Sequence, residues 1–208
     1  MSITLAIILI TALVSFPAFN NEKLRNDLLF WPYMVERYQQ HYRFITGGVV
    51  HADLFHLAFN MISLYSFGMA LEQSLFPAVF GEKSKVLYGF LYISSIVFAS
   101  LHDFIKHRND QGYRALGASG AVSAVIFSAI VIVPGMPIRF FFFPIDIPGY
   151  LFGFVFLGFS YYFAKKGGGN IGHNAHFWGA VYGVVFTLIA GRAFSHLDLL
   201  KRFLMEVF

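Results

Sequence analysis

The chain has 208 residues, of which 57% are hydrophobic and 12% are charged, and its formal net charge is +4. Soluble domains carry about 25% charged residues, so this composition excludes an ordinary soluble domain and indicates an integral membrane protein with one compact unit. The positive charge does not indicate nucleic-acid binding, because the basic residues lie between apolar runs, where Lys and Arg commonly flank membrane spans. The absence of cysteine excludes thiol catalysis, disulfides and thiolate metal sites.

Six apolar segments approach the ~20 residues that a membrane-spanning helix needs. They are residues 2–19, 55–76, 85–103, 116–134, 147–164 and 172–192. Only helices and closed barrels satisfy their backbone in lipid, and these runs lack the short alternating pattern of barrel strands. We therefore expect an all-α polytopic membrane protein with six spans, forming a single domain over residues 1–208.

The first segment is predicted to be a retained span rather than a signal peptide. No basic residue precedes Lys23, and no clear small-x-small cleavage site follows the apolar run. The loop after it, residues 20–54, is the longest and mixes aromatic with charged residues, a composition that suits the lipid headgroup zone. The C-terminal tail, SHLDLLKRFLMEVF, is amphipathic and is expected to lie on the membrane surface.

Charge gives one expectation for orientation. With six spans, nine Lys and Arg residues lie on the side of loops one, three and five, and six lie on the other side. The positive-inside rule would then place the long first loop in the cytoplasm.

The second segment contains HADLFHLAFN, in which His56 and Asn60 are four residues apart and share one helix face. Both side chains donate hydrogen bonds, and fixed donors of this kind stabilise the oxyanion of acyl transfer. The alternative is that each only links neighbouring helices. Glu72 lies near the end of the same segment.

The fourth segment begins GASG, residues 117–120, and places the small polar Ser119 at its head. Gly117 with Ala121, and Gly120 with Ala124, are four apart and form a face on which another helix can approach closely. Polar groups inside a membrane are costly and tend to be functional. Ser119 is therefore either a nucleophile or one more small packing residue, and this pattern alone leaves both open.

The sixth segment carries His176 beside a second small face made by Ala175, Gly179 and Gly183. Packing of the two small faces would bring the imidazole to the Ser119 hydroxyl. A neutral histidine could then act as general base toward the alcohol. The alternative is a buried histidine that hydrogen-bonds a neighbouring helix.

These three groups have a common expected depth in the membrane. His56, Ser119 and His176 each lie near the start of an even-numbered span, and these spans run in the same direction. All three are therefore expected at similar depth, facing a water-accessible cavity beneath loops one, three and five.

The motifs HxxxN, GxSG and AHxxG, in this order over residues 42–192, resemble the rhomboid family of intramembrane serine proteases. The resemblance implies that Ser119 is the nucleophile and His176 the general base and later acid. It implies an oxyanion hole made by His56, Asn60 and the Ser119 backbone N–H. The implied structural residues are Gly117, Gly120 and Gly179 in helix packing, Glu72 as a buried carboxylate, and Arg43 in ordering the first loop.

The resemblance also implies membrane-protein substrates within the lipid bilayer, with no cofactor, no metal and no nucleic acid. It implies a bacterial plasma membrane, cytoplasmic termini, and a first loop and active-site opening on the outer side. That orientation is opposite to the charge count, and we follow the resemblance because the charge margin is small.

The sequence departs from the family pattern at two positions and leaves two alternatives. Ser123 stands four residues after Ser119, where many members carry an aromatic ring stacked on the catalytic imidazole, and Tyr42 replaces the usual Trp. His173, one turn before His176, is expected to line the cavity. One alternative is a catalytically silent relative that binds transmembrane helices. The other is a b-type haem protein whose axial ligands come from His56, His102, His173 and His176.

Overall fold

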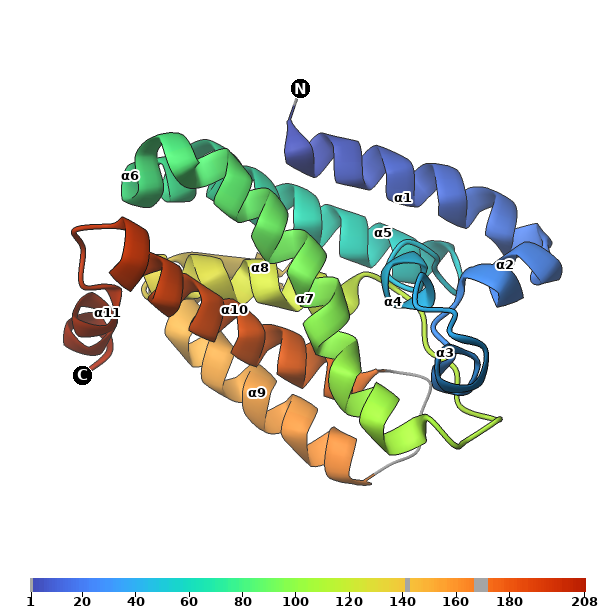
Figure 1. Ribbon diagram of the computed structural model, residues 1–208. Coiled ribbons are helices and arrows are strands. Elements are labelled where there is room, and N and C mark those ends of the chain that lie inside the picture. Colours follow the sequence, from blue (N-terminus) through green and yellow to red (C-terminus); the bar gives the residue numbers. More distant parts are fainter. Residues whose placement is uncertain (1, 141–142, 167–171) are drawn as a thin grey trace.

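The computed structural model describes residues 2–140, 143–166 and 172–208, which form a bundle of long helices (Figure 1). The long helices are α1 (Ile3–Asn20), α5 (Leu54–Ser63), α7 (Ser84–His107), α8 (Ser119–Ile132), α9 (Gly149–Lys166) and α10 (His173–Phe194). They correspond in order to the six predicted segments. The all-α fold class is confirmed.

The second segment stays helical beyond α5, through the π-helical stretches η1 (Leu64–Gly68) and η2 (Leu71–Leu75) into α6 (Phe76–Phe80). The chain then turns through the short 3₁₀ helix η3 (Gly81–Lys83) and runs back as α7, as Figure 1 shows. Gly81 makes this reversal possible because its φ of 55° lies in the left-handed region, which a residue without Cβ adopts readily.

By length and composition, three of the described helical stretches could cross a membrane: Ile3–Asn20, Leu54–His107 with its reversal at Gly81, and His173–Phe194. Helix α8 is apolar but shorter. The number of spans therefore stays a prediction.

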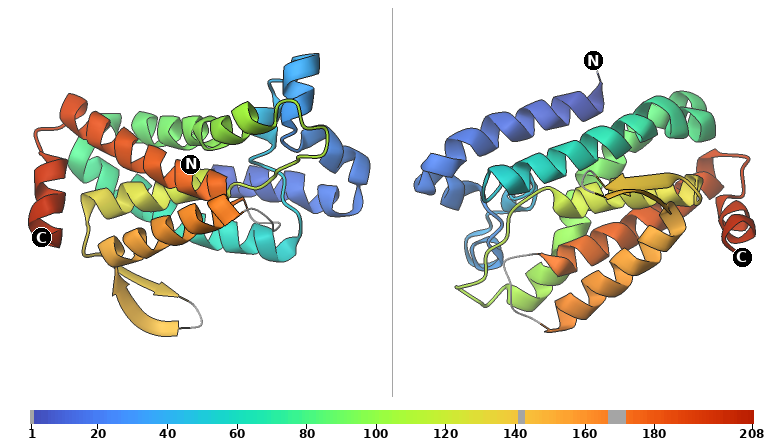
Figure 2. Two further views of the ribbon diagram at one scale, coloured as in Figure 1. Left: turned by 90° about the horizontal axis from the view of Figure 1, so that it is seen from below. Right: turned by 180° about the vertical axis from the view of Figure 1, so that it is seen from behind.

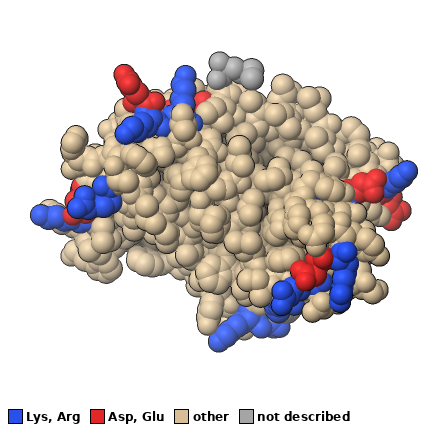
Figure 3. Space-filling view, viewed as in Figure 1, with Lys and Arg blue, Asp and Glu red and all other residues tan. Residues whose placement is uncertain are grey.

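The outer surface of the bundle has the character of a membrane protein. Large apolar side chains such as Phe55, Ile62 and Val86 are strongly exposed on it. In the space-filling view, charged side chains lie toward the margins of the face and leave a broad uncharged region between them (Figure 3). Burying such a surface in lipid removes the cost of its exposure to water, so the chain is an integral membrane protein.

Helix α8 lies at the centre of the bundle, between α5 and α10 (Figure 2, right). Every residue of α8 is buried except Ser119 and Ile126. Its sequence of Ala, Val, Ile, Phe, Ser and Gly has no long polar side chain, so it packs on all sides. Of its three serines, Ser123 and Ser128 are buried, and Ser119 at its head is partly exposed.

Two regions differ from the sequence-based expectation. Residues between α8 and α9 form an antiparallel hairpin of β1 (Pro137–Phe140) and β2 (Phe143–Pro148), which projects from the helices (Figure 2, left). Arg139 pairs across it with Asp146 at 2.8 Å. The first loop also contains three short helices, α2 (Glu22–Leu28), α3 (Pro32–Tyr38) and α4 (Arg43–Thr46). The tail forms α11 (Leu199–Val207).

Candidate active site

The small faces of α8 and α10 meet backbone to backbone. A Cβ added to Gly179 would overlap the carbonyl oxygen of Gly120, and one added to Gly183 would overlap that of Ala124. The helices therefore touch on two successive turns, which only glycine permits. Ser119 adjoins Gly120, so the crossing begins beside its side chain.

The α10 side of this crossing carries His176. The carbonyl oxygen of Ala175 lies 3.2 Å from the position of a Cβ on Gly120. Ala175 directly precedes His176, so both Ser119 and His176 adjoin residues of the same helix contact. Both residues are partly exposed, which leaves them accessible from outside the core.

The hydrogen bonds among the described residues do not include one between the Ser119 hydroxyl and the His176 ring. Catalytic hydrogen bonds are often long in enzymes without substrate and tighten only when substrate binds.

The GASG segment enters α8 under tight constraint from α5. Gly117 has a φ of 111°, and a Cβ on it would lie 2.7 Å from Nε2 of His56. Its N–H donates to the carbonyl of Gly47 in the first loop at 2.8 Å. Glycine is therefore needed here both for backbone conformation and for the close approach of the His56 ring.

Asn60 lies one turn after His56 on α5 and is buried. Its Nδ2 donates to the carbonyl of His56 at 2.9 Å. The His56 ring packs on Gly117, and α10 meets α8 three residues further along the chain, at Gly120. Residues from α5, α8 and α10 thus converge on one region, where the first-turn amides of α8 have no intrahelical acceptor.

His51 belongs to this region, although the sequence reasoning passed over it. It is fully buried and stands edge-on to His56, with ring centroids 4.9 Å apart. Its Nε2 accepts the Ala118 N–H at 3.2 Å. Nδ1 must then carry the proton and donate to Ser15 Oγ at 3.1 Å, and that hydroxyl donates to the Val49 carbonyl at 2.9 Å.

Burial lowers the pKa of His51 to about 3, with the charge of His56 as a smaller cause. The ring therefore stays neutral near pH 7, as its acceptor role at Ala118 requires. The only sequence signal was its place at the head of HADLFH.

A buried carboxylate at the end of α7 was also missed. Asp103 accepts the Tyr113 hydroxyl at 2.6 Å and the Asn174 amide at 2.9 Å. His102 Nδ1 lies 3.3 Å from the same carboxylate. Asp103 thereby joins α7 to the third loop and to the first turn of α10, two residues before His176.

The ring stacked on His176 comes from α9. The Phe156 and His176 ring centroids are 6.0 Å apart with an interplanar angle of 29°. The family pattern would place this ring at position 123, but Ser123 is a small buried residue inside α8. A ring supplied by a different helix from the one that carries position 123 leaves no local motif, so the sequence could not reveal it.

The two remaining predicted residues lie away from this region. Glu72 accepts hydrogen bonds from Ser2 Oγ at 2.6 Å and from the N–H groups of Ile3 and Thr4 at 2.7 and 2.8 Å. It therefore caps the first turn of α1. Arg43 is buried in the first loop.

Arg43 joins separate parts of that loop. Its Nη1 donates to the carbonyls of Asn26 and Leu29, each at 2.8 Å, and its Nε donates to Gln40 at 2.6 Å. A guanidinium that satisfies three acceptors from different turns holds them together.

Within the described ranges, no group of three or more His, Asp or Glu side chains is arranged to hold a metal ion. Of the four histidines considered for haem, His102 stacks on Trp178 and approaches Asp103, and His56 packs on Gly117. Each of these two has packing partners that serve the helix contacts.

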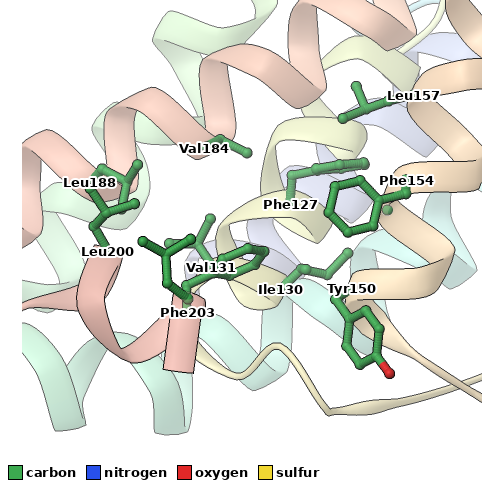
Figure 4. Close-up of a pocket in the computed structure, with 12 residues that line it drawn as sticks. Phe127, Ile130, Val131, Tyr150, Phe154, Leu157, Val184, Leu188, Leu200 and Phe203 are labelled. Atoms are coloured by element: carbon green, nitrogen blue, oxygen red, sulfur yellow. The ribbon is translucent and has the colours of Figure 1, made fainter. Parts of the chain in front are cut away.

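A separate apolar pocket of about 260 Å³ lies between α8, α9, α10 and α11 (Figure 4). Phe127, Val184 and Phe203 are among its lining residues, and none of its lining is charged. Phe127 connects it to the candidate site, because its ring centroid lies 5.6 Å from that of Phe156, the ring stacked on His176.

Comparison with known proteins gives two findings. A family model described as the Rhomboid domain matches residues 38–193. The chain is also 28% identical, over 151 residues, to the "RHOMBOID-like protein 12, mitochondrial" of Arabidopsis thaliana. The matched part is 68% of this chain and 44% of that protein, so the chain spans less than half the length of this relative.

Proposed function

Because the chain belongs to the rhomboid family, we propose that it is an intramembrane serine endopeptidase that works through Ser119 and His176. One observation carries the proposal. The backbone contact of Gly120 with Gly179 joins the buried helix that begins at the partly exposed Ser119 to the helix that carries the partly exposed His176, three residues before Gly179. Without a function, a hydroxyl and an imidazole at this crossing would be costly in a membrane.

In the proposed mechanism, His176 takes the proton of the Ser119 hydroxyl as its oxygen attacks the scissile carbonyl carbon. The resulting oxyanion accepts hydrogen bonds from His56, Asn60 and the Ser119 N–H. The intermediate collapses to an acyl-enzyme as His176 gives its proton to the leaving amine. Water, deprotonated by His176, then releases the acyl group and restores the serine.

The substrates would be single-span or polytopic membrane proteins. A peptide bond inside a helix is shielded, because its carbonyl already accepts a hydrogen bond. Cleavage should therefore favour segments with small or helix-destabilising residues near the membrane boundary.

Co-reconstitution with tagged single-span proteins in liposomes tests the proposal. Wild type should cleave, whereas Ser119→Ala and His176→Ala should be inactive while melting at wild-type temperature. A fluorophosphonate should label wild type and not Ser119→Ala. Normal cleavage by Ser119→Ala would overturn the proposal.

A second candidate is a catalytically silent rhomboid-like protein that binds transmembrane helices. The observation in its favour is that the Ser119 hydroxyl and the His176 ring are not joined by a hydrogen bond among the described residues. It predicts unlabelled wild type, no cleavage, and equal helix binding by wild type and Ser119→Ala.

For location, we propose a bacterial plasma membrane with cytoplasmic termini and the first loop outside. The chain has no cysteine, so the variants Glu36→Cys and Ser195→Cys can each be treated with an impermeant thiol reagent on intact cells. The reagent is expected to label Glu36→Cys and not Ser195→Cys. Labelling at Ser195 alone would reverse the orientation.

A further inference from the structure

Helix α9 covers two histidines of α10 with phenyl rings. Phe156 stacks on His176, and Phe163 stacks on His173 with centroids 5.2 Å apart and an angle of 27°. Phe156 and Phe163 are seven residues apart, two turns along one face of the helix. The same face of α9 therefore contacts both imidazoles at the start of α10.

Phe156 is itself held from behind by the central helix. Phe127 of α8 is buried, and its ring centroid lies 5.6 Å from that of Phe156 at an angle of 51°. The His176 imidazole, the Phe156 ring and the Phe127 ring thus form a continuous stack that joins α10, α9 and α8.

The His176 ring has two aromatic contacts among the described residues, the stack on Phe156 and an edge contact with His173 at a centroid distance of 6.1 Å. The hydrogen bonds of the described residues include none to the His176 ring nitrogens, and its backbone N–H bonds the Gly172 carbonyl. No carboxylate is therefore seen to fix the tautomer and angle of the imidazole, as one does in a serine protease triad. Packing must supply the orientation instead, and a stacked aromatic pair is worth about 0.5–1.5 kcal/mol.

The anchoring helix is lightly embedded in the bundle. The buried residues of α9 are Gly149, Gly153 and Ser160, whereas Val155 and Phe159 on its outer side are largely exposed. A helix with so few buried side chains shifts more easily than the fully packed α8. A shift of α9 away from α10 would remove the Phe156 ring from His176.

We propose that Phe156 is a positioning residue for His176, so that the placement of α9 sets the reactivity of Ser119. This inference rests on the proposed protease function. The proposal assigns to Phe156 of α9 the stacking on His176 that Ser123, which has no ring, cannot provide. The orientation of the His176 ring would then depend on the position of α9, which has few buried side chains.

The test measures cleavage in liposomes and the rate at which a small fluorophosphonate labels Ser119. Phe156→Ala should lower kcat roughly 10- to 100-fold, the scale of a small misplacement of a catalytic group, with little change in KM. Labelling should slow in parallel, because the small probe reacts with Ser119 without the binding of a substrate helix. Phe156→Tyr should restore most of both rates, whereas Phe156→Leu, which fills space without a ring, should not.

Phe154→Ala is the matched control, because Phe154 is a half-exposed ring on the same helix that lines the apolar pocket. It should keep near wild-type labelling. If Ser119 is labelled as fast in Phe156→Ala or Phe156→Leu as in Phe154→Ala, the positioning role is wrong. The protease assignment still holds in that case if Ser119→Ala is inactive in the same assay. Should Phe156→Ala fail to fold, the comparison of Leu with Tyr at this position decides. An active Ser119→Ala would remove the protease assignment itself.

Discussion

The backbones of Gly120 and Gly179 are in direct contact where α8 crosses α10. One turn further on, Gly183 meets the backbone of Ala124 in the same way. This crossing fixes the relative position of the helices that carry Ser119 and His176. A change of one methyl group at the contact must therefore affect both stability and chemistry.

Gly179→Ala should separate α8 from α10, because its Cβ would overlap the Gly120 carbonyl, a backbone atom that cannot move aside. Overpacking of this kind costs typically 1–3 kcal/mol. We expect a lower melting temperature in detergent and a larger proportional loss of cleavage, since the two residues of the proposed dyad lie on the two helices that would be displaced.

Gly158→Ala provides the control on a neighbouring helix. Nothing lies within 4 Å of a Cβ at Gly158, and alanine favours helix over glycine by about 1 kcal/mol. This variant should melt at the wild-type temperature or above and retain activity. Equal melting of the two variants would contradict the contact argument.

The α8–α10 crossing was readable from sequence because small residues four apart mark a close helix contact. Helix positions followed from apolar length, although α8 begins at Ser119 rather than at 116 and α9 begins at Gly149. The hairpin between them was not foreseen, because its apolar residues resemble an extension of the adjoining spans.

The contacts that orient the site were less accessible to sequence reasoning. Asp103 meets Asn174 across 71 positions, and His51 meets Ala118 across 67. Such pairs depend on how the helices are placed in space, and a single sequence carries no periodic signal for them. A short motif shows which residues share one helix. It does not show which side chains of other helices or loops contact those residues.

His56→Ala should lower kcat by about 10²–10³-fold, the usual effect of removing one oxyanion donor. Stability should change little, because the ring is partly exposed and packs on a glycine. Cleavage kinetics in liposomes and a melting curve would be measured together.

Phe55→Ala, a substitution at the adjacent position, is the control for His56→Ala. Its side chain is 88% exposed, so it should cleave as wild type. A His56→Ala variant with wild-type kcat would exclude His56 from the oxyanion hole.

Acid should destabilise the protein through His51. The ring stays neutral when folded because its pKa is lowered to about 3, whereas an unfolded histidine titrates near 6.5. Between these values the unfolded chain binds the extra proton, so stability falls as pH decreases. From pH 7 to pH 5 the contribution is about 2 kcal/mol.

His51→Gln removes that titration while keeping a polar side chain near Ala118. It should melt below wild type at pH 7, because the amide cannot reproduce both ring contacts, but its melting temperature should fall less between pH 7 and pH 5. Parallel pH profiles for the two proteins would show that His51 does not carry the acid sensitivity.

Glu72→Ala should loosen α1 without touching the proposed chemistry. It would leave the Ser2 hydroxyl and the N–H groups of Ile3 and Thr4 without their acceptor, and it would remove negative charge from a helix N-terminus. Hydrogen bonds to a charged group contribute about 1.5–3 kcal/mol each and are not additive, so a loss of about 2–4 kcal/mol is expected. Glu72→Gln, which retains one acceptor oxygen, should lie between.

The exposed Glu82→Ala serves as the comparison for charge alone and should melt as wild type. Glu72 lies 16 residues along the second helical segment from His56, about 24 Å at 1.5 Å per residue. Cleavage well below the melting temperature should therefore persist in Glu72→Ala. Lost activity in a variant that remains folded would mean that α1 docking controls the distant site, and the separation of stability from chemistry assumed here would not hold.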